Sequence, residues 1–153
     1  MQKLTLIDLE DFIWDKVEVI DTKAIVFSNK EDDDDYVLFF DGKDRECYVS
    51  LIEECFGEVE DLVGVQLIKA RQKYLLIEKN KFGRSHTWHF LRFLTEKGVV
   101  QIIWYVSTER KCLENLTLEE VKKEDIDSFI KTLKQSRNSD KLYSSKMLKT
   151  KKP

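Results

Sequence analysis

Short runs of alternating apolar and polar residues fill the chain up to about position 107, and turn-forming residues separate them. Alternation with a period of two is typical of strands that bury one face. The pattern predicts strands over residues 16–20, 23–28, 36–40, 46–50, 65–70, 73–78, 87–95 and 99–107. A looser helical spacing predicts a short helix within residues 4–14, and residues 51–62 are expected to form a helical turn and a loop.

Two turn signals indicate how these strands pair. Asp41 and Gly42 are typical hairpin-turn residues, so strands 36–40 and 46–50 are expected to be neighbours. The long runs 87–95 and 99–107 are joined only by three residues that end in Gly98, which predicts a second hairpin. Strand 99–107 is expected in the middle of the sheet, because one of its faces is wholly apolar, at Val100, Ile102, Trp104 and Val106.

A helix closes the predicted domain. Thr117 and Glu120 have the Thr-x-x-Glu spacing of a capping box, which predicts that the helix begins there. Its apolar residues recur at i, i+3, i+4 and i+7, namely Ile126, Phe129, Ile130 and Leu133. Such a stripe must pack on an apolar surface, and the exposed sheet face is the expected partner. The predicted fold class is α+β, a mainly antiparallel sheet of six to eight strands with a C-terminal helix packed on one face.

The composition changes once along the chain, near Gln135. A chain of 153 residues with 42% hydrophobic and 11% aromatic content can fill the core of one domain. Residues 136–153 are rich in Ser and Lys and poor in apolar residues, which is typical of a segment that buries too little surface to fold. We therefore predict a single α+β domain over residues 1–135 and a flexible Lys/Ser-rich tail over residues 136–153.

The net charge of −3 hides a strong asymmetry between the two halves of the chain. Residues 1–70 hold 19 acidic and 7 basic residues, whereas residues 71–153 hold 10 acidic and 19 basic residues. Such an asymmetry indicates polyanion binding by the basic part or an acidic face for a basic partner, unless folding mixes the signs. The densest acidic run is predicted to be a solvated loop and, if it has a role, a contact for a basic partner; it consists of Glu31, Asp32, Asp33, Asp34 and Asp35.

No catalytic, cofactor or metal constellation is visible in the sequence. His86 and His89 are the only histidines, and their spacing on a strand sends them to opposite faces, with His89 expected to be a core or edge histidine that has one ring nitrogen hydrogen-bonded. The three cysteines, Cys47, Cys55 and Cys112, show no Cys-x-x-Cys pair and are expected to be free thiols. The five glycines form no phosphate-binding loop. We predict a protein that is not an enzyme and needs no cofactor.

Aromatic residues on the predicted strands have two interpretations. Together with nearby lysines and arginines, they would form a stacking platform for single-stranded nucleic acid. Aromatic residues at strand spacing are more often core, and that interpretation is favoured here. The residues concerned are Trp88, Phe90, Phe93, Trp104 and Tyr105, with Lys79, Lys81, Arg84 and Arg92 close by in the sequence.

Several short motifs resemble those of a family of small uncharacterised domains found in phages and bacteria. They are the Thr95-Glu96-Lys97-Gly98 turn between an aromatic strand and a strand ending Ile103-Trp104, the segments Phe39–Gly42 and Cys47–Val49, and the run from Glu58 to Gly64. The resemblance covers roughly residues 16–107 and departs from the family after Val106, where a Ser-Asn-Gly-Tyr-Tyr type of turn is replaced by Ser107 to Cys112. It implies a similar fold and an origin in a phage or other mobile element, and implies no activity.

These observations predict a small protein-binding module that acts through an acidic surface, with a role as an inhibitor or immunity-type protein. The alternative is a nucleic-acid-binding protein that uses the basic C-terminal half and the tail. The chain has no run of about 18 apolar residues, and acidic residues occupy its N-terminus where a signal peptide would be cationic and then apolar. We therefore expect a cytoplasmic location, a protein partner and no contact with a membrane.

Overall fold

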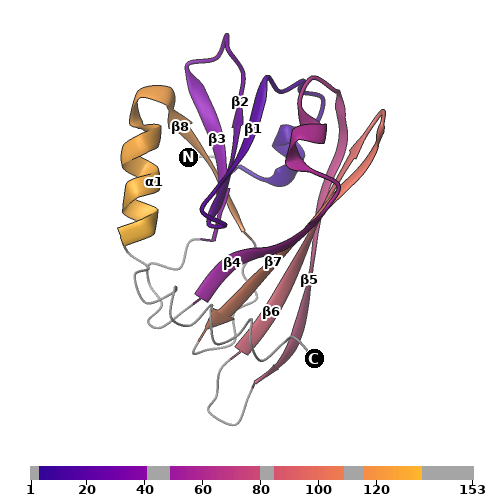
Figure 1. Ribbon diagram of the computed structural model, residues 1–153, viewed down its shortest axis with the longest axis vertical. Coiled ribbons are helices and arrows are strands. Elements are labelled where there is room, and N and C mark those ends of the chain that lie inside the picture. Colours follow the sequence, from indigo (N-terminus) through magenta and orange to yellow (C-terminus); the bar gives the residue numbers. More distant parts are fainter. Residues whose placement is uncertain (1–3, 41–48, 80–84, 109–115, 136–153) are drawn as a thin grey trace.

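The computed structural model describes residues 4–40, 49–79, 85–108 and 116–135. These residues form three layers, in which α1 covers one sheet and that sheet faces a second one (Figure 1). The elements in chain order, with η for a 3-10 helix, are η1 (Leu6–Leu9), β1 (Lys16–Ile20), β2 (Ala24–Ser28), β3 (Asp34–Phe39), β4 (Val49–Phe56), η2 (Val59–Leu62), β5 (Leu67–Lys79), β6 (Ser85–Thr95), β7 (Gly98–Thr108), β8 (Thr117–Lys122), η3 (Lys123–Asp125) and α1 (Ile126–Gln135). The predicted α+β class with antiparallel strands is confirmed, although the strands form two sheets and not one.

The first sheet has the order β1-β2-β3-β8 and is antiparallel throughout. Its outer face packs on the apolar stripe of α1, where Ile130 and Leu133 are buried against Val37 and Val121. The ring of Phe129 meets the ring of Phe39 edge-on, with 5.3 Å between their centroids. The predicted packing of the helix on a sheet face is thereby confirmed, and it gives the domain a small second core.

The second sheet has the order β4-β7-β6-β5, so that β7 lies between two partners as expected of a central strand. The predicted hairpin of β6 and β7 is also confirmed, with Thr95 opposite Gly98. Gly98 has a φ of 143°, a conformation that residues with a side chain rarely adopt. The Thr95 hydroxyl accepts a hydrogen bond from the Lys97 amide at 3.1 Å and donates one to the Gly98 carbonyl, which fixes the turn.

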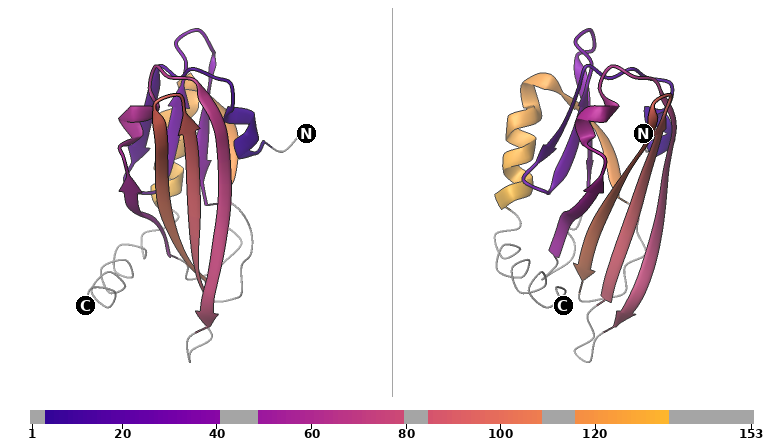
Figure 2. Two further views of the ribbon diagram at one scale, coloured as in Figure 1. Left: turned by 90° about the vertical axis from the view of Figure 1, so that its right-hand side faces the viewer. Right: turned by 45° about the vertical axis from the view of Figure 1, so that its right-hand side comes forward.

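The main core lies between the two sheets. Phe27 of β2 and Trp14, which precedes β1, extend into this core from one side. Phe93 and Trp104 of the second sheet extend into it from the other side. Burying one such apolar side chain stabilises the fold by roughly 1.5–3 kcal/mol. At the β1–β2 turn the Ile52 amide of β4 donates a hydrogen bond of 2.8 Å to the Thr22 carbonyl, and β5, β6 and β7 extend beyond the first sheet (Figure 2).

The predicted hairpin of strands 36–40 and 46–50 is wrong. β3 pairs with β2 and β8 in the first sheet, whereas β4 pairs with β7 in the second sheet. Asp41 and Gly42 lie outside the described residues. β4 also continues to Phe56, where a helical turn was expected, and only Val59–Leu62 is helical. A bulge between Ile52 and Glu54 shifts the register of β4, which removes the alternation by which strands are recognised.

The expected capping box at Thr117 is also wrong, because residues 117–122 form β8 and the 3-10 turn begins only at Lys123. Leu118 is buried in the main core, while Val121 is buried on the opposite side beneath α1. Two apolar residues three apart resemble a helical period even though they mark the two faces of one strand. The long β5 combines two predicted strands, and the N-terminal helix shrinks to one 3-10 turn.

Candidate functional site

The acidic run of residues 31–35 divides between a turn and a strand. Glu31, Asp32 and Asp33 are exposed in the β2–β3 turn, whereas Asp34 and Asp35 are the first residues of β3. Asp35 is only 7% exposed, and its Oδ1 has no hydrogen-bond partner in the described structure. Burial removes Asp35 from the surface that a partner would touch. The solvated contact that was predicted for five carboxylates is therefore limited to the first four residues of the run.

The topology brings a second acidic segment beside this run. β8 pairs with β3 so that Asp34 lies opposite Lys122, and the Lys123 amide donates a hydrogen bond of 3.0 Å to the Asp33 carbonyl. Residues 30–35 hold five acids and one lysine, and residues 119–125 hold four acids and two lysines. We call the carboxylates of this region that are not buried the acidic edge; they belong to Glu31, Asp32, Asp33, Asp34, Glu119, Glu120, Glu124 and Asp125.

The carboxylates of the acidic edge raise the pKa values of their neighbours. Loss of hydration, a hydrogen bond to Asp34 and the charges of Asp34 and Asp32 raise the pKa of Glu120. Burial is the largest cause that raises the pKa of the Tyr36 hydroxyl, followed by the charges of Glu120, Asp32, Asp8 and Asp34. Loss of hydration is the largest cause of both shifts, and the nearby carboxylates add to it in the same direction.

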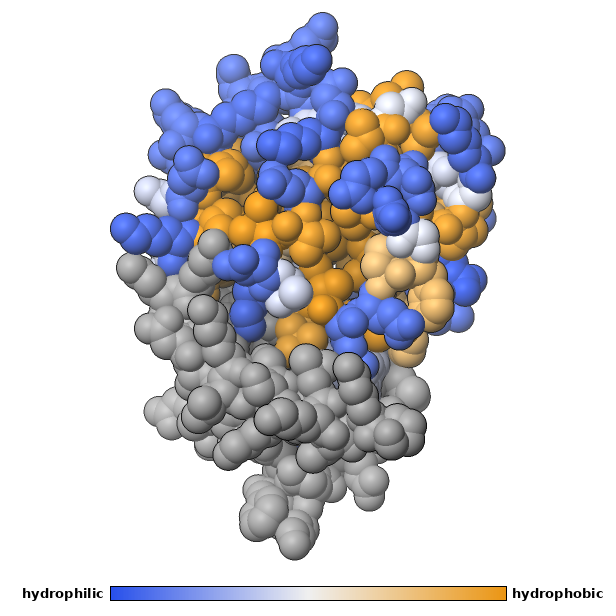
Figure 3. Space-filling model, viewed as in Figure 1, coloured by the Kyte–Doolittle hydropathy of each residue, from blue (hydrophilic) through white to orange (hydrophobic). Residues whose placement is uncertain are grey.

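A groove of about 500 Å³ runs along the acidic edge between β8 and α1. Glu119 and Asp125 line it together with the half-buried ring of Phe129 and the hydroxyl groups of Ser128 and Thr132. The groove therefore offers carboxylates, hydroxyls and one aromatic surface to the same ligand. Figure 3 shows hydrophilic residues gathered over the end of the molecule that carries the β2–β3 turn.

The two histidines lie on opposite faces of β6, as predicted. His89 is 1% exposed in the interior, and its Nδ1 accepts a hydrogen bond of 2.9 Å from the Gln72 amide nitrogen. Burial lowers the pKa of His89 to about 4, so the ring is neutral at physiological pH. His86 lies on the outer face, where its Nδ1 is 2.6 Å from the Tyr105 hydroxyl. This arrangement fits the prediction of a core histidine at position 89.

Among the cysteines, only Cys55 belongs to the described residues, and it is an exposed free thiol. Cys47 and Cys112 lie outside them. Burial and the charges of Glu60, Asp61 and Glu58 raise the pKa of the Cys55 thiol. Within the described ranges, no three His, Cys, Asp or Glu side chains come together as a metal site would require.

The aromatic residues of the second sheet divide between its two faces. Phe93 and Trp104 are fully buried in the main core, as the favoured interpretation expected. Trp88, Phe90 and Tyr105 alternate with them and belong to the outer face, which α1 does not cover. The Trp88 indole donates a hydrogen bond of 3.3 Å to the Glu53 carboxylate, and its ring lies 4.9 Å from that of Tyr105.

Sequence reasoning missed the second acidic segment and the exposed Phe56. The acids of β8 and η3 were assigned to a helix, so nothing indicated that they would lie beside residues 31–34. Phe56 was assigned to a loop, yet it lies on β4 opposite Gln101 with 52% of its surface exposed. An apolar run interrupted by two acids, as at residues 51–56, was the available signal for a bulged strand.

Comparison with protein-family models finds no match, and comparisons with curated proteins and with solved structures find none either. The family resemblance drawn from short motifs therefore stays a prediction. None of the helices in the described ranges has the length and apolar character needed to cross a membrane.

Proposed function

We propose that this protein is a non-enzymatic binding module whose acidic edge binds a lysine- or arginine-rich segment of a partner protein. The observation that carries the proposal is the convergence of two acidic segments, 31–34 and 119–125, where the edge strand β8 pairs with β3. A cationic ligand would relieve the repulsion that raises the pKa of Glu120. Complementary charge of this kind favours fast association and selects against acidic partners.

The groove adds a second element of recognition. A flexible basic chain that lies along β8 would place cationic groups near Glu119 and Asp125 and an apolar side chain against Phe129. Such a mixture of charge and one buried anchor is typical of protein interfaces, where a few well-packed residues supply most of the affinity. If the bound segment is the partner's own site for an anion or nucleic acid, binding would inhibit that partner. The finer form of the proposal is an inhibitor or immunity-type role in the cytoplasm, for a protein of a phage or other mobile element.

A defined probe tests the proposal without knowledge of the partner. Fluorescence anisotropy would measure binding of a labelled ten-residue peptide of alternating Arg and Ala, with a Glu-Ala peptide as the negative control. We expect the basic peptide to bind and the affinity to fall as salt rises. The edge variant Asp32→Asn/Asp33→Asn/Glu120→Gln should bind about tenfold more weakly, since each exposed charge pair contributes roughly 0.5 kcal/mol.

A matched variant separates the edge from the overall charge. Glu54→Gln/Glu60→Gln/Glu96→Gln removes three exposed carboxylates that belong to β4, η2 and the β6–β7 turn. We expect this variant to bind within twofold of the parent protein. Equal weakening by both triple variants, or no binding of the basic peptide at low salt, would show that the edge is not a site.

A further inference from the structure

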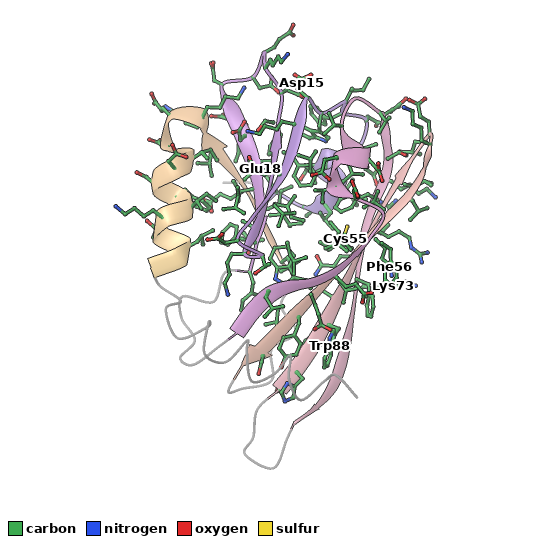
Figure 4. All side chains as sticks on the ribbon, in the orientation of Figure 1. Asp15, Glu18, Cys55, Phe56, Lys73 and Trp88 are labelled. Carbon is green, nitrogen blue, oxygen red and sulfur yellow. The ribbon has the colours of Figure 1, made fainter. Side chains whose placement is uncertain are left out.

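The outer face of the second sheet carries aromatic and cationic side chains side by side. The register places Lys73 of β5 beside Phe90 of β6, and Lys69 beside Leu94 and thus Val99 of β7. Arg92 lies in the row between these two, with Arg71 of β5 on one side of it and Gln101 of β7 on the other, and Phe56 of β4 ends the row. We call this surface the aromatic–cationic face and define it by Lys69, Lys73, Arg92, Phe56, Phe90 and Val99. In Figure 4, Phe56 and Lys73 lie on the side of the second sheet that points away from β1 to β3.

The charge of this face is positive. The outward positions of β5, β6 and β7 over residues 69–73, 88–94 and 99–105 include no carboxylate. Arg71 is engaged by Glu10, and Lys69 is close enough to Glu10 to help lower its pKa. Lys73 is exposed, and Arg92 donates a hydrogen bond of 3.2 Å to the neutral side chain of Gln101. The acids of the sheet that reach this face are on β4, where Glu54 lies in the row of Phe90 and Lys73 and Glu53 accepts a hydrogen bond from the Trp88 indole.

The face also presents apolar side chains to solvent. Phe56 is 52% and Val99 is 51% exposed, while Phe90 is half-buried between its neighbours on the strands. Contiguous apolar surface of this kind marks interaction sites. The strands that carry these side chains are already paired, so the backbone needs no ordering when a ligand covers them.

We propose that the aromatic–cationic face binds single-stranded nucleic acid. Bases stack on aromatic side chains regardless of sequence, and a row of cations neutralises the phosphates beside them. Lys69 and Lys73 are four residues apart on β5, which places them about 14 Å apart along the strand at roughly 3.4 Å per residue, with Arg71 between them. An extended strand along β5 would place its phosphates over these lysines and its bases over Phe90 and toward Phe56. This proposal is independent of the acidic edge, which lies on the first sheet.

A duplex and a second copy of the chain are the competing ligands, and the structure favours neither. A duplex hides the faces of its bases, so Phe56 and Phe90 would contribute nothing to its binding. A second copy would have to present its acidic edge, whose groove provides only Phe129 as a large apolar partner for this face. A single strand offers phosphates to the cations of this face and accessible bases to its aromatic rings.

Anisotropy titrations of the full-length protein with labelled 15-nucleotide dT and U strands, and with a 15-base-pair duplex, test the proposal between 20 and 200 mM salt. We expect the single strands to bind more tightly than the duplex. The variant Lys73→Gln/Arg92→Gln should flatten the slope of log K against log salt by up to about 0.7 for each lost contact. The control Lys16→Gln/Lys131→Gln, which removes exposed lysines of β1 and α1, should leave the slope unchanged.

A separate variant tests the contribution of base stacking to the affinity for single strands. Phe56→Leu keeps an apolar side chain at an exposed position, so the fold should tolerate it, yet the stacking surface is lost. Single-strand affinity should fall at least about fivefold, the lower end of the loss expected for one stacked base, with no change of the salt slope. Unchanged affinity in Phe56→Leu together with equal binding of the duplex would overturn the proposal.

Two further results would also overturn it. The tail contains five lysines, at positions 141, 146, 149, 151 and 152, which attract phosphates by themselves. If changing these five to Gln abolishes binding while the face variants bind normally, the tail is the binding site. If light scattering shows self-association that Lys73→Gln/Arg92→Gln prevents, and no strand binds, the face contacts a second copy of the chain.

Discussion

At the scale of single residues, burial keeps the His89 ring neutral at a pH where an exposed imidazole takes up a proton. Its pKa of about 4 lies below the ordinary value of 6.5 because the ring is buried. The unfolded chain therefore takes up a proton at this ring as the pH falls through 6.5, whereas the folded protein does not. The contribution of the neutral His89 ring to the free energy of unfolding is fully present above pH 6.5 and decreases progressively as the pH falls toward 4.

The expected loss from His89 between pH 6.5 and pH 4 is about 3 kcal/mol, at 1.36 kcal/mol for each pKa unit. Urea unfolding at pH 7, 5.5 and 4.5 measures it by comparison with His89→Gln, in which carboxylates titrate as before and the imidazole is absent. The free energy of the parent protein should fall more steeply with decreasing pH than that of the variant. Parallel curves would mean that His89 is hydrated in the folded protein.

The Cys55 thiol gives a second prediction at this scale. Burial and nearby carboxylates raise its pKa, so the reactive thiolate is scarcer than in a free cysteine at pH 8. Iodoacetamide should modify Cys55 more slowly than an unstructured peptide that contains the same residue. Glu60→Gln should speed this reaction, whereas Glu18→Gln on β1 should not, and peptide mass spectrometry would separate Cys55 from Cys47 and Cys112. A faster reaction than in the free peptide would contradict the account.

At the scale of elements, the packing of α1 decides whether the acidic groove exists. Phe129→Ala should destabilise the protein by about 3 kcal/mol, the lower end for truncation of a phenylalanine, because the ring is half-buried against Phe39. Lys131→Ala on the exposed side of α1 should change stability by less than about 0.5 kcal/mol. Denaturant unfolding measures both. A loss below about 1 kcal/mol in Phe129→Ala would place the helix outside the core.

Elements with a simple pattern were predictable from the sequence, and those whose neighbours decide their form were not. The β6–β7 hairpin and the stripe of α1 follow from local period and a short turn. β8 did not. Leu118 is buried in the main core and Val121 beneath α1, and two apolar residues three apart in the sequence resemble one face of a helix. The bulge in β4 had the same effect on residues 51–56. The division into two sheets depends on contacts between distant segments, about which a local pattern says nothing.

The same reasons limited what could be predicted about the acidic edge. Residues 31–35 were recognised as a candidate contact from their density of charge alone. Their partners, Glu119 and Glu120, became visible only when β8 was found beside β3. The burial of Asp35 could not be predicted either, because it depends on the same pairing of β3 with β8.

At the scale of the whole molecule, folding rearranges the charge asymmetry of the sequence, because the acidic edge combines residues 31–34 of the acidic half with residues 119–125 of the basic half. Acidic residues gather at the edge formed by β3, β8 and η3, while cations stand on the outer face of β5 and β6. The two surfaces belong to different sheets of the sandwich. We therefore expect a protein with two separable binding faces, in which neutralising one leaves the other intact.

The central claim is that the acidic edge binds cationic protein segments, and chemical-shift mapping of the folded protein tests it most directly. Titration of the ¹⁵N-labelled protein with the Arg-Ala peptide at 50 mM salt should shift the amide signals of residues 31–34 and 119–125, and those of Ser128 and Phe129 beside the groove. Signals of β5 and β6 should stay in place. Shifts confined to the second sheet, or spread evenly over all acidic residues, would contradict the account.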